Sequence, residues 1–326
     1  APRVAMWRAG IVGLASVWFP YTKLEYSESL VATTILGTWY FAPRRPLVAG
    51  LLAGFAISLR IDSLLWVFIT LLIVPGNRSN KLRLLLGMIP GVLLTAWSYW
   101  VRTGTLHQYG AGDAGFHNPI WVGAYGILFS AGKSIFLFSP LLLLIGMTWR
   151  KAYSQPATRR LAVWALALFA GQLIFYSMWW DWSGDDSWGA RFMIASVLTL
   201  HIIVMAFADL RSRLIQLLII AGLCIQLPAV LLGPHTSLML NHIQKPTKVN
   251  VYMGDRSPIT IDDVRFHPRY SQVTATWELL ATKITKRQPR SPDAVRLGTT
   301  WSEGFSEPPL ADWDIFWFHL DRRSRP

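Results

Sequence analysis

The chain has 326 residues, of which 52% are hydrophobic and 15% are charged, and its mean hydropathy is +0.35. Soluble domains carry about 25% charged residues, so this composition excludes an ordinary soluble protein and predicts a polytopic membrane protein. The net charge of +13 would suggest nucleic-acid binding in a soluble chain. Here the basic residues fall in short breaks between apolar runs, so we expect cytoplasmic anchoring and no nucleic-acid partner.

Nine apolar segments are candidates to cross a bilayer, which takes about twenty apolar residues in a helix. The third and fourth segments are short for full crossings and are also typical of a pair that enters the membrane and returns. The sequence therefore predicts an all-α fold with about nine transmembrane or re-entrant helices. We expect a helical domain over residues 1–233 and a small C-terminal tail or cap over 234–326. The nine segments are residues 6–22, 28–43, 46–60, 62–76, 82–101, 134–149, 160–179, 192–208 and 213–233.

The breaks between these segments alternate in charge. Every second break is basic, and Asp209 is the one acid among these basic residues. The positive-inside rule assigns such breaks to the cytoplasm, so the other breaks and the tail should face the opposite side. The basic residues are Arg44, Arg45, Arg78, Lys81, Arg83, Arg150, Lys151, Arg159, Arg160, Arg211 and Arg213.

Two of the outward breaks combine cations with carboxylates. The stretch YTKLEYSES contains Lys23 and Glu28. These residues are either solvated turn residues or a pair that binds phosphate and orients a hydroxyl. The stretch ISLRIDSLLW contains Arg60 and Asp62, and ionisable residues at the membrane edge are usually paired and functional. Because residues two apart on one helix do not face each other, we expect a break between short helices here.

The longest outward break is read as a loop over residues 102–133. Its two histidines, His107 and His117, are ten residues apart, and a zinc site would need more ligands at better spacing. We therefore predict no zinc site. Lys133, in FSAGKSIFLFSP, comes just before an apolar segment. It either binds phosphate or reaches the lipid headgroups along its own aliphatic stem.

The stretch WWDWSGDDSWGARF, residues 179–192, concentrates aromatic and charged side chains between two apolar runs. Arg191 either reaches lipid phosphates at the surface or grips a phosphate held in a cavity. The aspartates are either solvated or oxygen ligands of a divalent cation, Mg²⁺ or Mn²⁺. The tryptophans form an interfacial belt or stack on a sugar or lipid. The candidate metal ligands are Asp181, Asp185 and Asp186, and the candidate stacking residues are Trp180, Trp182 and Trp188.

The tail and the apolar segments add smaller signals. The tail contains a strand-like stretch, VNVYMGD, a helical stretch, QVTATWELLATKITKR, and an aromatic end, DWDIFWFHL. Within the apolar segments, Gln172, His201 and Gln226 are the strongly polar residues, and we expect each to make an interhelical hydrogen bond. Because so few polar residues lie in mid-segment, a transporter of lipid-linked sugars ranks below an enzyme or a scaffold.

Five stretches in chain order resemble bacterial family-39-like glycosyltransferases of the C superfamily, relatives of protein mannosyltransferases. They cover most of residues 15–320, with Arg60 at a Thr-Arg position of the family and Lys133 where arginine is common. The stretches are WFPYTKLEYSESLVATTIL, RRPLVAGLLAGFAISLRIDSLLWV, YGILFSAGKSIFLFSPLLLL, WWDWSGDDSWGARFMIAS and VRFHPRYSQV.

The resemblance implies an enzyme of the bacterial cytoplasmic (inner) membrane, with its active loops and C-terminal tail extracytoplasmic. Such an enzyme moves a sugar, with inversion, from a polyprenyl-phosphate carrier in the membrane lipid to an acceptor hydroxyl. Glu28 is then the candidate carboxylate that orients the acceptor. The candidate phosphate-binding cations are Lys23, Arg60, Lys133 and Arg191.

The sequence departs from this family in one respect. The family's catalytic acid lies in the first extracytoplasmic loop, whereas this chain resembles the family from about the third span onward. No Asp-Glu or Asp-Asp pair in a long outer loop precedes residue 60. We therefore expect a chain that lacks the first two spans, a partner membrane subunit that supplies the acid, or a non-catalytic scaffold subunit derived from such an enzyme.

Overall fold

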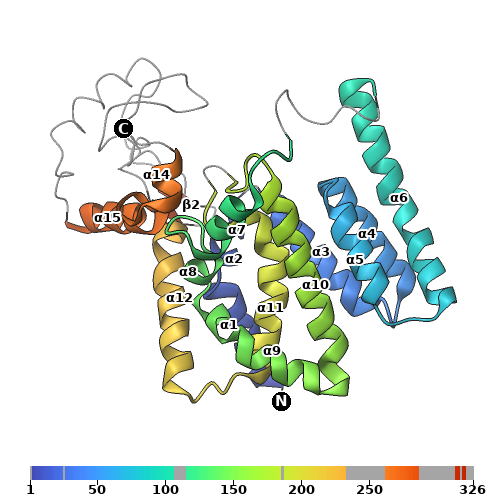
Figure 1. The fold of residues 1–326 in the computed structure, drawn as a ribbon, viewed down its shortest axis with the longest axis horizontal. Helices are drawn as coiled ribbons and strands as arrows, with labels where there is room; N and C mark the ends of the chain where they lie inside the picture. The colour runs from blue at the N-terminus through green and yellow to red at the C-terminus, as the bar shows by residue number, and fades with distance from the viewer. Residues whose placement is uncertain are drawn as a thin grey trace.

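The computed structural model describes residues 2–24, 26–105, 115–184, 187–232, 261–285, 313–315 and 318–320, which are mainly helical. The elements are α1 (Pro2–Leu14), α2 (Trp18–Tyr21), α3 (Glu28–Phe41), α4 (Pro46–Leu59), α5 (Ser63–Ile73), α6 (Arg78–Thr103), α7 (Ile120–Phe129), α8 (Ile135–Phe138), the 3₁₀ turn η1 (Pro140–Leu144), α9 (Ile145–Ser154), α10 (Pro156–Met178), η2 (Arg191–Met193), α11 (Ile194–Phe207), α12 (Arg213–Leu232), α14 (Ile261–Phe266), η3 (Pro268–Tyr270), α15 (Gln272–Thr285), β1 (Trp313–Ile315) and β2 (Phe318–Leu320). Figure 1 shows their arrangement.

Each of the nine predicted apolar segments contains helix. In the described part of the chain, three helices are long and apolar enough to cross a membrane, namely α6, α10 and α12. The shorter helices α3, α4 and α11 have 14 residues each. At 1.5 Å per residue such a helix covers about 21 Å, less than the hydrocarbon core of about 30 Å. The helical fold is confirmed, whereas the count of nine crossings is not.

The outer surface of α6 shows why the chain needs a lipid environment. Its side chains Leu82, Leu93, Trp97 and Trp100 are each about 60% exposed. In the most apolar stretch of 18 residues of this helix, 22% of the residues are buried. Contiguous apolar surface of this kind is unfavourable in water. A bilayer removes that cost because its hydrocarbon core is as apolar as these side chains.

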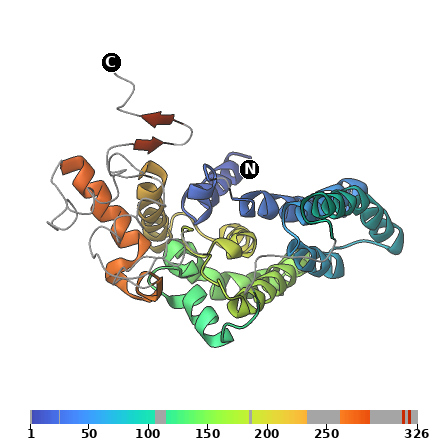
Figure 2. The same cartoon turned by 90° about the horizontal axis from the view of Figure 1, so that it is seen from above.

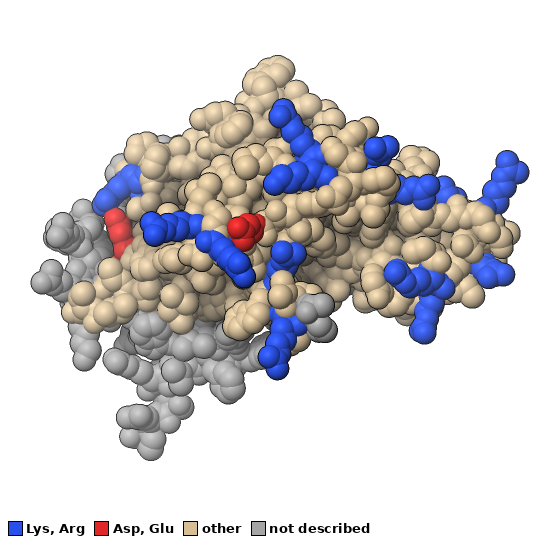
Figure 3. Space-filling view, turned by 90° about the horizontal axis from the view of Figure 1, so that it is seen from below, with Lys and Arg blue, Asp and Glu red and all other residues tan. Residues whose placement is uncertain are grey.

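The two ends of the helix bundle differ in charge. The turns between α5 and α6, α9 and α10, and α11 and α12 lie at the lower end in Figure 1, and these are basic turns of the sequence. Figure 3 views the molecule from below and shows Lys and Arg side chains spread over this face, with few Asp or Glu. The C-terminal ends of α6, α10 and α12 lie at the opposite, upper end.

Helix α6 is attached to the rest of the bundle mainly through α4, with which it makes its closest approach (Figures 1 and 2). Two glycine pairs, each at four-residue spacing, allow this. A Cβ atom on Gly50 would lie 2.1 Å from the Leu84 carbonyl oxygen, and one on Gly91 would lie 2.1 Å from the carbonyl carbon of Gly54. Gly87 is similarly tight against α4. Such small-residue pairs let two membrane helices pack backbone to backbone.

Three polar residues within the apolar segments were expected to make interhelical hydrogen bonds, and two of them do. Gln172 accepts a hydrogen bond from the Ser196 backbone N–H of α11, and Gln226 bonds Trp188 and a carbonyl outside its own helix. These two interhelical bonds are confirmed. The prediction is wrong for His201, whose Nδ1 contacts the Val197 carbonyl of its own helix. A polar side chain within a helix can reach the backbone carbonyl four residues back.

The connections and the tail differ from the prediction in two places. The stretch 102–133 is not a continuous loop, because α6 extends to Thr103 and α7 begins at Ile120. The helix predicted over QVTATWELLATKITKR is confirmed as α15. The aromatic end forms a short antiparallel hairpin of β1 and β2, with Trp313 paired to Leu320. The strand-like VNVYMGD lies outside the described residues.

Candidate functional site

A cluster of charged residues joins α3 to the turn between α4 and α5 at the upper end of the bundle. Arg60 Nη1 donates to Glu28 Oε1 at 2.7 Å, and Arg60 Nη2 donates to Asp62 Oδ2 at 3.0 Å. Helix α4 ends at Leu59, and Arg60 is extended, with φ −152° and ψ 124°. The predicted helix break is confirmed, and it allows two residues only two positions apart to face each other.

Two aromatic residues extend this cluster to α10 and η2. The Tyr176 hydroxyl donates to Asp62 Oδ2 at 2.5 Å, and the Tyr176 ring stacks on Phe192 with centroids 4.7 Å apart. The guanidinium carbons of Arg60 and Arg191 lie 5.1 and 4.7 Å from the centroid of the Phe192 ring. Cations within about 6 Å of a ring face are attracted to it, so Phe192 helps to hold both arginines.

Arg191 is bound more loosely than Arg60. Its Nε lies 3.6 Å from Glu28 Oε1, beyond hydrogen-bond distance, and its guanidinium lies over the ring of Tyr26. Within the described residues, Arg191 Nε and Glu28 Oε2 are buried without a hydrogen-bond partner. Buried polar atoms are nearly always bonded. One donor and one acceptor at the site therefore lack a partner among the described residues.

The neighbours of Arg60 keep its side chain charged. Burial alone would lower the pKa of Arg60, but Tyr176, Asp62 and Glu28 raise it by more, so the pKa lies above its ordinary value. Two arginines, Arg60 and Arg191, balance the two carboxylates Glu28 and Asp62, and the excess positive charge of this region comes from Arg102, which lines a cavity together with Arg60. An anion is the ligand that this excess charge attracts.

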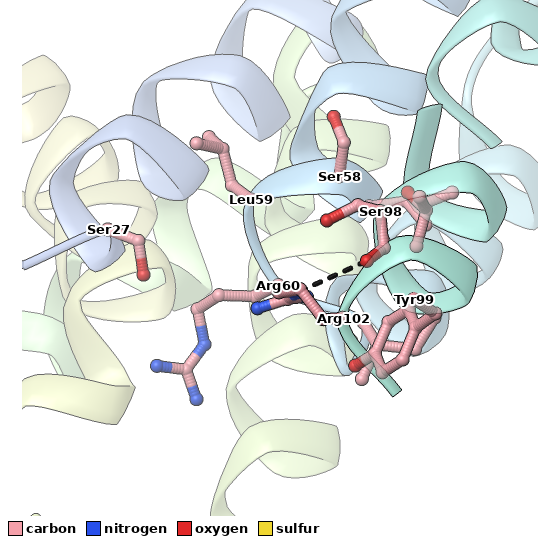
Figure 4. A pocket seen from close by; sticks show the side chains of 10 residues that line it. Ser27, Ser58, Leu59, Arg60, Ser98, Tyr99 and Arg102 are labelled. Atoms are coloured by element: carbon pink, nitrogen blue, oxygen red, sulfur yellow. Dashed lines mark hydrogen bonds between the residues drawn. The ribbon is translucent and has the colours of Figure 1, made fainter. Parts of the chain in front are cut away.

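Two cavities meet at Arg60. The first, of about 290 Å³, lies between α4 and α6 and is mainly polar (Figure 4). The second, of about 200 Å³, is mainly aromatic and has Asp62 in its lining. The polar lining residues of the first are Ser27, Ser58, Arg60, Thr95, Ser98, Tyr99 and Arg102. The second is lined by Arg60, Ile61, Asp62, Phe116, Phe175, Tyr176, Trp179 and Phe192.

The four predicted phosphate-binding cations do not all meet in the structure. Arg60 and Arg191 lie together on Glu28 and Phe192. Lys23 Nζ donates to the Val230 carbonyl near the end of α12, and Lys133 Nζ donates to the Ser187 carbonyl. Of the four, Arg60 lines both cavities described above, whereas Arg191 and the two lysines line neither. Binding of one phosphate by all four candidate cations is therefore not confirmed.

Two of the three predicted stacking tryptophans are packed inside the protein. Trp188 is fully buried, donates to Gln226 and packs edge-on against Phe138. Trp182 is 2% exposed and lies beneath the Arg265 guanidinium. Trp180 is 38% exposed. Only Trp180 of the three is thus accessible to a ligand from the surface.

The predicted metal ligands are only partly described. Asp181 accepts a hydrogen bond from Ser183 and lies 3.5 Å from Arg265, whose cation neutralises it. Asp185 and Asp186 lie outside the described residues. Among the residues that are described, no group of three His, Cys, Asp or Glu side chains is placed to hold a metal ion. The Asp181 carboxylate is already paired with an arginine, so in this arrangement it does not fit the role of a metal ligand.

Several residues of the site were missed in the sequence. Thr95, Ser98, Tyr99 and Arg102 recur at positions i, i+3, i+4 and i+7 of α6, which places them on one face of a helix. This polar stripe on an otherwise apolar helix was the available signal. Tyr176 gives no such signal, because its role depends on a contact with a residue 114 positions away.

No protein-family model, curated protein or solved structure matches this chain. The functional argument therefore rests on the geometry of the Arg60 cluster and its two cavities.

Proposed function

We propose that the chain is a membrane glycosyltransferase that moves a sugar from a polyprenyl-phosphate carrier to an acceptor hydroxyl, and that the Arg60 cluster is its active site. The observation that carries the proposal is the position of Arg60 between a polar, cationic cavity and an aromatic cavity that has Asp62 in its lining. A lipid-linked sugar phosphate presents matching groups, with an anionic phosphate next to a sugar ring.

The aromatic cavity suits a single sugar ring. Aromatic faces stack on the apolar face of a sugar, and a carboxylate accepts hydrogen bonds from its hydroxyls. Trp179 supplies a face beside Tyr176 and Phe192, which stack on each other, and Asp62 supplies the carboxylate. With a volume of about 200 Å³, the cavity is smaller than the usual range of about 300–1,000 Å³ for drug-sized ligands. A small group is therefore expected there.

The cations suit the leaving phosphate. In the proposed reaction an acceptor hydroxyl oxygen attacks the anomeric carbon, and the bond from that carbon to the phosphate oxygen breaks. The polyprenyl phosphate leaves with the electron pair, and Arg60 and Arg191 stabilise its negative charge. Asp62, the carboxylate that lines the cavity, takes the hydroxyl proton. Glu28, which lines neither cavity, holds both arginines in place.

The membrane setting follows the same proposal. The basic turns at one end of the bundle face the cytoplasm under the positive-inside rule. The Arg60 cluster, at the other end, then faces the extracytoplasmic side of a bacterial cytoplasmic membrane. The exposed apolar surface of α6 lets a polyprenyl chain approach through the bilayer. The steps above use residues of this chain, and Asp181, one of the three candidate metal ligands, is paired with Arg265.

A non-catalytic scaffold subunit of a larger complex is the second candidate. The observation in its favour is that Arg60 already binds both carboxylates. The cluster therefore also has a structural role, because its hydrogen bonds link α3, α10 and the turn after α4. The apolar face of α6 would then contact a partner membrane subunit. The enzyme candidate predicts that a substrate is converted at the Arg60 cluster, and the scaffold candidate predicts that none is.

The test uses the full-length protein in liposomes that contain a polyprenyl-phosphate sugar labelled in the sugar. We expect labelled sugar to pass to an acceptor and unlabelled polyprenyl phosphate to accumulate. A nucleotide sugar supplied without the lipid donor should give no transfer. If neither product appears with any polyprenyl-phosphate sugar, while the protein is folded, the scaffold candidate replaces the enzyme.

A further inference from the structure

We propose that the cavity between α4 and α6 binds the phosphate group of a lipid, and that Arg102 is the second cation of this site. Arg102 comes from the last turn of α6, and Arg60 comes from the turn after α4. Both side chains line the same cavity, and in Figure 4 the Arg60 guanidinium extends away from Ser58, Ser98 and Tyr99. The proposal deepens the function given above, because it assigns a place to the phosphate of the carrier.

The two arginines retain hydrogen-bond donors for a ligand. A guanidinium has five N–H groups, and within the described residues Arg60 uses three of them on Glu28 and Asp62. Arg102 donates through Nε to the Ser98 carbonyl and lies over the ring of Tyr99. In the described part of the chain its four Nη–H groups have no protein acceptor. Phosphate is bound by such forks through pairs of parallel hydrogen bonds.

The hydroxyl groups around the cavity separate into two kinds. Ser58 and Thr95 donate to carbonyl oxygens of their own helices, at Phe55 and Gly91. The hydroxyls of Ser27 and Ser98 make no hydrogen bond to another described residue, although both line the cavity. They are free to donate to phosphate oxygens. The lining of the cavity therefore combines two arginines with two hydroxyls that have no partner among the described residues.

The surroundings of the cavity indicate a lipid as the source of the phosphate. Trp97, Trp100 and Val101, on the same two turns of α6 as Ser98 and Arg102, are between 60 and 65% exposed. Tryptophan is enriched at the level of the lipid headgroups. A phosphate in this cavity would thus lie at headgroup depth, and its hydrocarbon chain could follow the exposed apolar side of α6. A free phosphate ion would gain nothing from that surface.

The close contact of α4 with α6 sets the width of the cavity. Gly54 and Gly91 meet backbone to backbone less than two turns below Ser58 and Thr95. Larger residues at the glycines would move α6 away from α4 and carry Arg102 away from Arg60. The glycine contact thus positions two cations that come from different helices.

Binding is measured directly, so that it does not depend on sugar transfer. The full-length protein in detergent is titrated with farnesyl phosphate, with farnesol and with inorganic phosphate, and bound ligand is quantified by equilibrium dialysis. We expect farnesyl phosphate to bind most tightly and Arg102→Gln to weaken it at least tenfold. The matched control is Arg83→Gln, because Arg83 is an exposed arginine at the opposite end of the same helix.

Several results would overturn the proposal. Unchanged farnesyl phosphate binding by folded Arg102→Gln would remove Arg102 from the site. Equal binding of farnesol would show that the phosphate is not recognised, and equal binding of inorganic phosphate would show that the lipid is not. If Arg102→Gln fails to fold, Ser98→Ala provides the same test, with a loss of at least threefold expected. The inference rests on the proposed function only for the identity of the carrier. Binding of farnesyl phosphate without any sugar transfer would therefore refute the proposed enzyme activity but would still support the phosphate site.

Discussion

Arg60 donates a hydrogen bond to Glu28 at 2.7 Å across 32 residues of sequence. This contact fixes the turn after α4 against the first turn of α3, where Glu28 is the first residue. Asp62 and Tyr176 extend the same network to α10. A side chain held by three helical elements loses little entropy when a ligand binds, and such preorganisation favours electrostatic stabilisation of a transition state.

Removal of the Glu28 charge should destabilise this network. In Glu28→Gln the guanidinium groups of Arg60 and Arg191 lose a shared carboxylate, and Glu28 is only 6% exposed. We expect the free energy of unfolding to fall by about 1–3 kcal/mol. Thermal or chemical unfolding of the purified protein in detergent measures it. A variant as stable as the parent would show that the pair contributes nothing to the fold.

Arg191→Gln should separate function from folding. Among the described residues Arg191 has one loose ion pair and two ring contacts to lose, so we expect a stability change of about 1 kcal/mol or less. If Arg191 stabilises the leaving phosphate, kcat should fall by about 100- to 1,000-fold. Arg160→Gln is the control, since Arg160 is an exposed arginine near the N-terminal end of α10, at the opposite end of that helix from Tyr176. Equal activity of the two variants would exclude Arg191 from the site.

Trp188 and Trp180 should respond differently to truncation. Trp188→Ala removes a fully buried ring and its hydrogen bond to Gln226, so we expect a loss of about 3–5 kcal/mol of stability. Trp180→Ala removes a ring that is 38% exposed and should leave the fold nearly unchanged. Unfolding curves of the two variants measure the difference. The opposite order would mean that Trp188 is free to contact a ligand.

The glycine contact between α4 and α6 should not tolerate a side chain. A Cβ atom at position 91 would lie 2.1 Å from the backbone of Gly54, which cannot move without separating the helices. We expect Gly91→Leu to cost about 1–3 kcal/mol, as overpacking does, and to weaken farnesyl phosphate binding. Gly146→Leu is the control, because nothing lies within 4 Å of a Cβ at Gly146. Equal stability of both variants would contradict the close packing.

Much of the fold could be predicted from the sequence, because apolar periodicity and basic turns are local signals. The positions of the helices and the break at Arg60 were predicted from runs of a few residues. The count of nine crossings is not confirmed, since a run of apolar residues does not show where a helix starts and stops. Helix α5, for example, has only 11 of the 15 residues in its predicted segment.

The site was less predictable, because it depends on contacts between distant segments. Arg60, Glu28 and Arg191 were identified from charge placed between apolar runs, and the structure brings them together. Lys133 gave the same local signal, yet its ammonium is used on the Ser187 carbonyl inside the protein. A sequence shows that a charge lies near the membrane edge but does not show which way its side chain turns.

The measurement that tests the central claim most directly is the rate of sugar transfer from a polyprenyl-phosphate sugar by Asp62→Asn. Asparagine has the shape of aspartate but cannot take the acceptor proton. We predict measurable transfer by the parent protein and a fall in kcat of at least about 100-fold in the folded variant, with Arg160→Gln unchanged. Transfer by Asp62→Asn at the rate of the parent would contradict the assignment of the active site to the Arg60 cluster.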